Sequence, residues 1–296
     1  MIKKTPFYVK FLIFSLFCLS SCVSGCTTIK ISNASQKEIL PRNSFVQIQQ
    51  SVELEGCGID QETKEKKCQK AMMRYVSSGA YVFHSEVTQD ISYVLTAGHS
   101  CENKLPKVQN IRGFEIRNKG ASFKVVDLNG FQHDARVVNI NNRFDLCLLQ
   151  VSDVLMNPPV LSLAENEPKR GETVTNMAAP HGLFWPGTVL IFKGQFSGYH
   201  NKGYSIYTIP TKPGSSGSPV LNKNNELVGV IFAGYPMIEN VGLSAPLVAI
   251  KVFLKKSIVI GEMRLFEKDN KPKVNTQIDR LWIQKMKTKL NEVFGN

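Results

Sequence analysis

Apolar and polar residues alternate over short segments through most of the chain between residues 44 and 246. This alternation has the period of a β-strand that buries one face. Turn residues, mainly Gly, Asn and Pro, separate the segments, and few of them have a helical period. Strands are expected at residues 44–49, 78–83, 91–95, 114–116, 121–126, 135–140, 146–149, 172–177, 187–192, 204–209, 226–234 and 242–246. Short strands at this spacing predict antiparallel β-barrels.

The C-terminal part of the chain has a helical pattern instead. One helix is expected to start at residues 247–254, and an amphipathic helix is expected over residues 276–294. The apolar side of the second helix is predicted to hold Ile278, Leu281, Trp282, Leu290, Val293 and Phe294.

Half of the net charge of +12 lies in residues 251–296, which contain eleven Lys or Arg and five Asp or Glu. Two interpretations stay open for this basic tail. It packs on the barrels with its lysines in solvent, or it contacts an anionic membrane. Nucleic-acid binding is not expected, because no motif of interleaved aromatic residues accompanies the charge.

The N-terminal residues have the pattern of an export signal. Lys3, Lys4 and Lys10 precede the apolar run at residues 11–19. This run is too short to span a bilayer, which favours a signal peptide over an anchor helix. The polar residues 33–42, which include a proline, are typical of a linker.

Two cysteines follow this run at positions suited to lipidation. The residues Leu-Ser-Ser-Cys at 19–22 resemble the bacterial lipobox, whose cysteine is lipidated and becomes the new N-terminus. Cys22 is the expected site, and Cys26 is the alternative because Val-Ser-Gly-Cys fits the same pattern. The predicted protein is therefore an exported lipoprotein anchored to the membrane of the cell envelope. A plain signal peptide cleaved near residue 24, giving a secreted or periplasmic protein, is the alternative.

Four cysteines lie in the expected folded part of the chain, where an oxidising compartment would allow disulfides. Cys57 and Cys68 flank a charged segment, residues 58–67, that is not expected to order itself. A local disulfide between them is the simplest expectation. Cys101 and Cys147 stay open, because free cysteines also pack well as small apolar groups.

Residues 214–219, Gly-Ser-Ser-Gly-Ser-Pro, have the composition of a nucleophile loop. A serine hydroxyl needs a base to take its proton, and the oxyanion that it creates needs fixed N–H donors. Glycines let the backbone turn its amides toward that oxyanion. The same residues would also suit a surface turn, so the interpretation depends on a base and an orienting acid elsewhere in the chain.

Both partners are present upstream. Thr96-Ala97-Gly98-His99 ends an expected strand, and Asp145 stands at the head of the apolar run at residues 146–149. With the serine loop, these motifs resemble those of the trypsin-like (chymotrypsin-fold) serine proteases over about residues 43–256. The order His, Asp, Ser is that of this family. The sequence looks closest to the bacterial branch that includes HtrA-type and V8-type proteases, without the PDZ domain of HtrA proteins.

The resemblance implies two six-stranded antiparallel β-barrels followed by a C-terminal helix. It also implies that Ser216 is the nucleophile, His99 the general base and then acid, and Asp145 the group that orients the imidazole. Gly214 and Ser216 would supply the N–H donors of the oxyanion hole. The expected activity is that of a serine endopeptidase acting on proteins or peptides, with no cofactor and no metal.

The expected domain organisation is a signal peptide with lipobox at residues 1–22, a linker at 23–42, the protease domain at 43–256 and a basic tail at 257–296. Ser215 and Ser218 are rival hydroxyls, and Asp127, Asp134 and Asp153 are rivals of Asp145. Pro210 stands where family members selective for Lys or Arg carry an acid, which disfavours cleavage after basic residues. A trypsin-like surface lipoprotein that binds peptides or protein partners without cleaving them is the alternative function.

Overall fold

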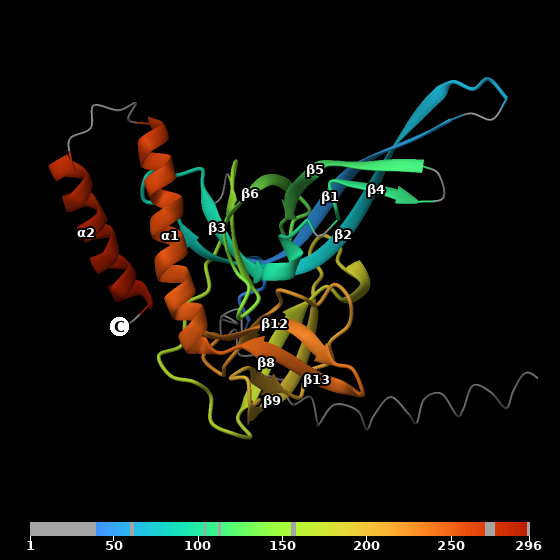
Figure 1. The fold of residues 1–296 in the computed structure, drawn as a ribbon. Helices are drawn as coiled ribbons and strands as arrows, with labels where there is room; N and C mark the ends of the chain where they lie inside the picture. Colours follow the sequence, from blue (N-terminus) through green and yellow to red (C-terminus); the bar gives the residue numbers. More distant parts are fainter. Residues whose placement is uncertain are drawn as a thin grey trace, which may run out of the picture. The chain divides into compact units, whose positions relative to one another are not determined.

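The computed structural model describes residues 40–59, 62–103, 105–111, 114–154, 158–269 and 276–294 (Figure 1). The predicted leader with Cys22 and Cys26, and nearly all of the predicted linker at residues 23–42, lie outside the described residues.

Six antiparallel strands form the first barrel in the order β1-β2-β3-β7-β6-β5, and the pairing of β1 with β5 closes it. Strand β4 adds to β5 outside the closed ring. The bounds are β1 Phe45–Ile59, β2 Lys66–His84, β3 Ser92–Ala97, β4 Val108–Ile111, β5 Phe114–Val126, β6 Gln132–Asn141 and β7 Leu146–Val151. Strand β7 is buried on both faces, which accounts for its apolar run at residues 146–149.

The second barrel is closed by six strands in the order β10-β13-β12-β11-β8-β9. Its bounds are β8 Thr173–Ala178, β9 Leu190–Tyr199, β10 Ser205–Tyr207, β11 Pro219–Leu221, β12 Leu227–Tyr235 and β13 Ile238–Ala245. The two antiparallel barrels and the C-terminal helices form a chymotrypsin-like fold, as predicted.

A long β1–β2 ribbon, with β5 paired to β1 as far as Cys57, departs from the prediction for the charged segment at residues 58–67. Strands β1 and β2 stay paired as far as Ile59 and Lys66, and Figure 1 shows them running beyond the barrel. The backbone ladder satisfies its own hydrogen bonds whatever the side chains are. Opposite charges also pair between neighbouring strands. The Lys70 Nζ of β2 lies 3.6 Å from the Glu53 carboxylate of β1, and the Lys119 Nζ of β5 lies 2.8 Å from the Glu55 carboxylate of β1.

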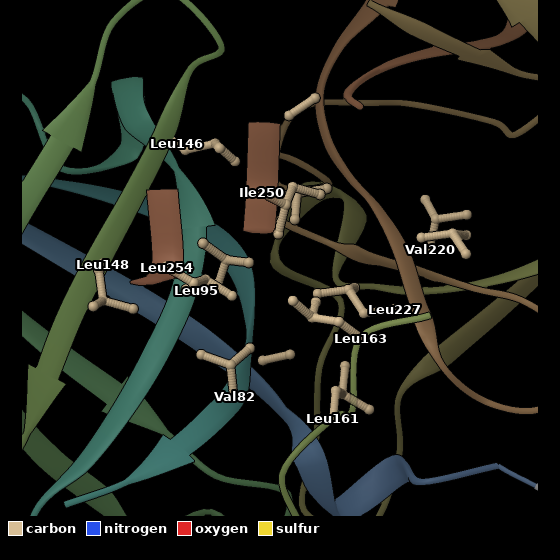
Figure 2. Close-up of a cluster of buried hydrophobic side chains, with 14 of the residues drawn as sticks. Val82, Leu95, Leu146, Leu148, Leu161, Leu163, Val220, Leu227, Ile250 and Leu254 are labelled. Atoms are coloured by element: carbon tan, nitrogen blue, oxygen red, sulfur yellow. The ribbon is translucent and has the colours of Figure 1, made fainter. Parts of the chain in front are cut away.

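One apolar cluster spans both barrels, and a second, which includes Tyr81, Val94 and Leu149, belongs to the first barrel alone. Figure 2 shows Val82 and Leu95 of the first barrel, Val220 and Leu227 of the second, and Ile250 between them. Ile250 belongs to helix α1, Leu247–Asp269, which therefore packs where the barrels meet. Burial of these side chains is the main force that holds the two barrels together, because apolar surface is removed from water on both.

Helix α1 extends past the predicted domain boundary at residue 256, and part of the predicted basic tail is buried. Glu262 is fully buried and accepts hydrogen bonds from the Tyr93 hydroxyl at 2.7 Å and the Glu86 N–H at 2.8 Å. Burial raises the pKa of the Glu262 carboxyl. These contacts fix the second half of α1 to the first barrel.

The second helix, α2, has the predicted bounds Thr276–Phe294, but its apolar face differs from the prediction. Met286, Leu290 and Phe294 are buried, whereas Leu281 and Val293 are 61% and 43% exposed. The side chain of Ile278 lies outside the described residues. The difference arises because α2 packs against both α1 and the first barrel. The side chains that are buried are those that face these two elements.

Two contacts document that packing. The Trp282 ring stacks on the Phe266 ring of α1 with centroids 5.1 Å apart. The ring centroids of Phe294 and of Phe83 in β2 are 6.3 Å apart. Among the described residues, no helix is both long enough and apolar enough to cross a membrane.

Both pairs of cysteines in the folded part are disulfide-bonded. The predicted Cys57–Cys68 bond joins residues directly opposite each other in the β1–β2 ribbon. The second bond, Cys101–Cys147, settles the question that the sequence left open. It connects the turn after β3 with β7 inside the first barrel.

These positions predict different consequences for stability. Replacing Cys101 and Cys147 together by Ser should lower the free energy of unfolding by about 4 kcal/mol, because the bond closes a long loop within the core. Replacing Cys57 and Cys68 by Ser should instead loosen the ribbon and shift the melting temperature of the barrels by no more than about 2 °C. Calorimetry on both double variants checks this, and equal shifts in melting temperature would contradict it.

Candidate active site

The loop that carries Ser216 is fixed to both barrels. Gly217 N–H donates to the Ile231 carbonyl at 2.6 Å, and Ile231 N–H donates to the Ser218 carbonyl at 3.0 Å, which ties the loop to β12. On the other side, Ser78 N–H of β2 donates to the Ser216 carbonyl at 2.7 Å. The Ser216 backbone therefore cannot move without breaking a contact to one barrel.

His99 lies in the short 3-10 turn Gly98–Ser100 that follows β3. Its Nε2 is 2.9 Å from the Ser216 Oγ, and its Nδ1 is 2.6 Å from the Asp145 Oδ2. An ionised carboxylate only accepts hydrogen bonds, so Nδ1 must carry the proton that points at Asp145. In the neutral imidazole Nε2 is then unprotonated and can accept the hydrogen of the Ser216 hydroxyl.

Asp145 holds both the ring and the backbone of His99. While Oδ2 accepts from the ring, Oδ1 accepts the His99 backbone N–H at 2.6 Å. Gly98 is required beside it, because a Cβ there would come within 2.7 Å of the Asp145 Oδ1. The antiparallel register of β3 with β7, Ala97 opposite Leu146, brings the two segments together.

Two backbone N–H groups of the Ser216 loop are left without an acceptor among the described residues. The Pro213 carbonyl accepts the His181 N–H at 2.5 Å. Because C=O and N–H of a trans peptide point in opposite directions, the Gly214 N–H points away from His181. Gly214 takes the φ of +94° that this turn needs. In the part of the chain that the structure describes, neither the Gly214 nor the Ser216 N–H has an acceptor.

The rival serines have structural contacts instead. Ser218 is fully buried, and its Oγ accepts from the Asn176 side-chain amide at 2.8 Å. Ser215 is 1% exposed, and its Oγ lies 3.4 Å from the Lys212 N–H. Ser216 is the serine of this loop whose hydroxyl contacts a histidine.

His84, His133 and the rival aspartates Asp127 and Asp153 make contacts away from His99 and Ser216. His84 contacts Ser92 and the Pro158 carbonyl, and burial lowers the pKa of its ring. His133 is hydrogen-bonded to the Asp153 carbonyl and lies 3.5 Å from Asp127. No group of His, Cys, Asp and Glu in the described residues is arranged to hold a metal ion.

Two contributors to the site were missed in the sequence. The Ser78 hydroxyl donates to the Gly214 carbonyl at 2.8 Å and accepts the Ala179 N–H at 3.0 Å. It therefore positions Gly214, one of the two residues expected to supply the oxyanion-hole N–H groups. Asn176 similarly supports the end of the loop through Ser218 and the Pro219 carbonyl. Neither residue stands in a motif, so only the folded chain shows their role.

A cleft of about 460 Å³ opens onto these groups. His99, Gly214 and Ser216 are among its lining residues. One wall is the β1–β2 ribbon near Tyr75 and Val76, and the remaining lining residues are Gln50, Val52, Ser77, Ser100, Glu102, Asn103, Leu105 and Pro213. The hydroxyl of Ser216 is thus accessible from outside, as a nucleophile must be.

A double β-barrel with a Ser–His–Asp contact chain between the barrels defines the class of the trypsin-like peptidases. The sequence matches the family of the trypsin-like peptidase domain over residues 77–230, and the chain belongs to this family. No curated protein sequence matches the chain.

Among solved structures, 717 chains are similar to this one. A serine endoprotease from Yersinia pestis is 18% identical, with a TM-score of 0.52, over 73% of this chain and 63% of its own length. An inactive mutant form of Rv3671c from M. tuberculosis H37Rv is 14% identical, with a TM-score of 0.49, over 73% of this chain and 87% of its own. At 18% identity, the likeness to the Yersinia pestis enzyme shows the shared fold.

Two glycines allow a test of how tightly the nucleophile loop is packed. Gly217 and Gly203 have nearly the same φ, +85° and +82°, but a Cβ on Gly217 would overlap the Ser78 carbonyl and the Thr96 hydroxyl, whereas one on Gly203 would meet nothing within 4 Å. Gly203→Ala should cost about 1 kcal/mol of backbone strain. Gly217→Ala should cost at least about 3 kcal/mol and remove activity. Equal losses in chemical denaturation would show that the loop has room to shift.

Proposed function

We propose that the chain is a serine endopeptidase that cleaves peptide bonds through His99, Asp145 and Ser216. The observation that carries this proposal is the unbroken set of contacts from the Asp145 carboxylate through the His99 ring to the Ser216 hydroxyl, at 2.6 and 2.9 Å. A binding module would not need all three groups in this order.

The chemistry follows from that arrangement. As Ser216 Oγ attacks the carbonyl carbon of the substrate, His99 Nε2 takes its proton, and the carboxylate of Asp145 stabilises the imidazolium that results. The oxyanion accepts hydrogen bonds from the N–H groups of Gly214 and Ser216. His99 then gives its proton to the leaving amine nitrogen, and the C–N bond breaks. A water molecule, deprotonated by the same nitrogen, hydrolyses the acyl ester.

Removal of the nucleophile tests this role. Ser216→Ala should lower kcat by about 10⁵-fold or more on a peptide selected from a library, because only binding and oxyanion stabilisation would remain. Ser215→Ala is the matched control, since it removes the neighbouring hydroxyl, and it should stay within about tenfold of the wild type. Retained proteolysis in Ser216→Ala would exclude Ser216 as the nucleophile. A folded wild-type protein that cleaves nothing would favour the peptide-binding alternative.

We further place the chain in the bacterial branch of the family, near the HtrA-type and V8-type proteases, which the sequence motifs indicate. The likeness in fold to a bacterial serine endoprotease supports this placement. The supported substrates are proteins and peptides.

Export and lipid anchoring are also part of the proposal. Two disulfides in the folded part support an oxidising compartment. Cys22, or alternatively Cys26, would carry the lipid, since each follows small residues after the apolar run. The buried face of α2 already packs against α1 and the first barrel, which argues against that helix as the membrane contact.

Cell fractionation tests the anchor. Replacing Cys22 and Cys26 by Ser, separately and together, should move the protein from the membrane to the soluble fraction when the lipidated residue is lost. The single variant that has this effect identifies the lipidated cysteine. If the double variant stays in the membrane fraction, lipid is not the anchor.

A further inference from the structure

Strand β2 has a long unpaired edge that begins beside the Ser216 loop, residues 214–219. It pairs with β1 from Lys66 to Ala80, but with β3 only from Ala80 onward. Among the described residues, no strand pairs with the other edge of β2 between Lys66 and Gly79. Exposed edges of this length are rare in soluble proteins, because they invite another chain to pair.

The backbone groups on this edge can be assigned from the register. Ser78 N–H donates to the Ser216 carbonyl and the Ser78 carbonyl accepts from the Thr96 hydroxyl, so both Ser78 groups point away from β1. The pairing of β1 with β2 has no register shift from Ala80 to Lys66. Alternate residues therefore point the same way as Ser78. These are Val76, Arg74, Met72 and Lys70, and their N–H and C=O groups face the free edge.

The edge is continuous with the active-site cleft. Tyr75, Val76 and Ser77 line the cleft together with His99 and Ser216. Along the following residues the strand keeps large apolar side chains in solvent: Val76 is 38%, Tyr75 44% and Met72 58% exposed. A polypeptide that leaves the catalytic serine on this side of the cleft meets an unpaired strand with apolar side chains.

We propose that the β2 edge between Val76 and Lys70 binds the part of the substrate that follows the cleaved bond, as an added antiparallel strand. The proposal rests on the proposed peptidase activity. The chain direction of β2 leads toward Ser78 and the Ser216 loop. A substrate segment that extends from Ser216 along β2 therefore runs antiparallel to it. Main-chain hydrogen bonds supply affinity in such strand addition, with little demand on sequence.

The geometry also defines the class of substrate. Four backbone positions separated by two residues span about 20 Å, which corresponds to about six substrate residues beyond the cleaved bond. Only an extended, unfolded segment can present its backbone in this way. The outer half of β2 has Lys66, Lys67, Lys70 and Arg74 and no acidic residue, which disfavours a basic segment. The preferred substrates are thus unfolded chains with a neutral or acidic apolar segment after the cleavage site.

Peptides of graded length provide the test. All have the same residues before the cleaved bond, taken from a peptide that the protein cleaves in a Ser216-dependent way, followed by two, four, six or eight residues of alternating Val and Glu. We expect kcat/KM to rise about tenfold between the two-residue and the six-residue segments and to level off at eight, because each added pair of residues makes main-chain hydrogen bonds to β2. A flat response would overturn the inference while the proposed peptidase function stands.

Backbone methylation locates the hydrogen bonds without changing the protein. N-methylation at successive positions of the six-residue segment should reduce kcat/KM at alternate residues only, since every second N–H faces β2. Uniform or absent effects would overturn strand addition.

Two variants of Met72 test the same hydrogen bonds from the side of the protein. Met72→Pro removes an N–H that faces the free edge, where proline is tolerated, whereas Met72→Thr keeps that N–H and removes the same side chain. The ratio of kcat/KM for the six-residue and two-residue segments should fall toward one in Met72→Pro and stay near the wild-type ratio in Met72→Thr. Equal ratios in the two variants would overturn the role of the edge.

Two further outcomes separate the alternatives. If the wild-type protein is a dimer at assay concentration and Met72→Pro converts it to a monomer, the edge is an interface between two copies and the inference is overturned. If no peptide of any length is cleaved, the proposed function fails and this inference fails with it.

Discussion

The Ser216 loop can place its hydroxyl against His99 only because it is held by both barrels. His99 and Asp145 belong to the first barrel, and the loop belongs to the second. The bonds from Ser78 to the carbonyls of Ser216 and Gly214 cross the junction between them. Without these bonds, the apolar core would still hold the barrels together, but nothing would fix the serine to within hydrogen-bond distance of the imidazole.

The rest of the fold serves to keep that junction rigid. Helix α1 packs between the barrels, and its buried Glu262 is tied to β3 through Tyr93. Cys101–Cys147 links the turn that carries His99 to the strand that begins after Asp145. Catalytic groups must be kept within fractions of an ångström of their productive geometry, so such supports matter for activity as well as for stability.

Much of the candidate active site could be predicted from the sequence because each of its segments is local. The segments around His99, Asp145 and Ser216 each have a distinct sequence, and glycines mark the tight turns. The contacts of Ser78 could not be predicted, because they depend on how two barrels pack and no local pattern records that. Most β-strands were recognised from their alternation, but β4 and the outer parts of β1 and β2 were not.

The ribbon beyond Val52 and the face of α2 illustrate that limit. The charged segment at residues 62–67 is exposed to solvent, and an exposed segment has the same polar sequence whether or not its backbone is paired. In α2, Leu281 and Val293 fit the periodic pattern but are exposed, whereas Met286 is buried where the helix packs against its neighbours. Periodicity predicts the presence of an apolar stripe, and tertiary packing decides its position.

Covalent labelling with a fluorophosphonate tests the central claim most directly, since only an activated serine reacts with it. Digestion and mass spectrometry of the labelled protein should show one adduct, on Ser216, and His99→Ala should abolish it while circular dichroism shows an intact fold. An adduct on Ser215 or Ser218, undiminished labelling in His99→Ala, or a folded wild-type protein that takes no label would each contradict the account.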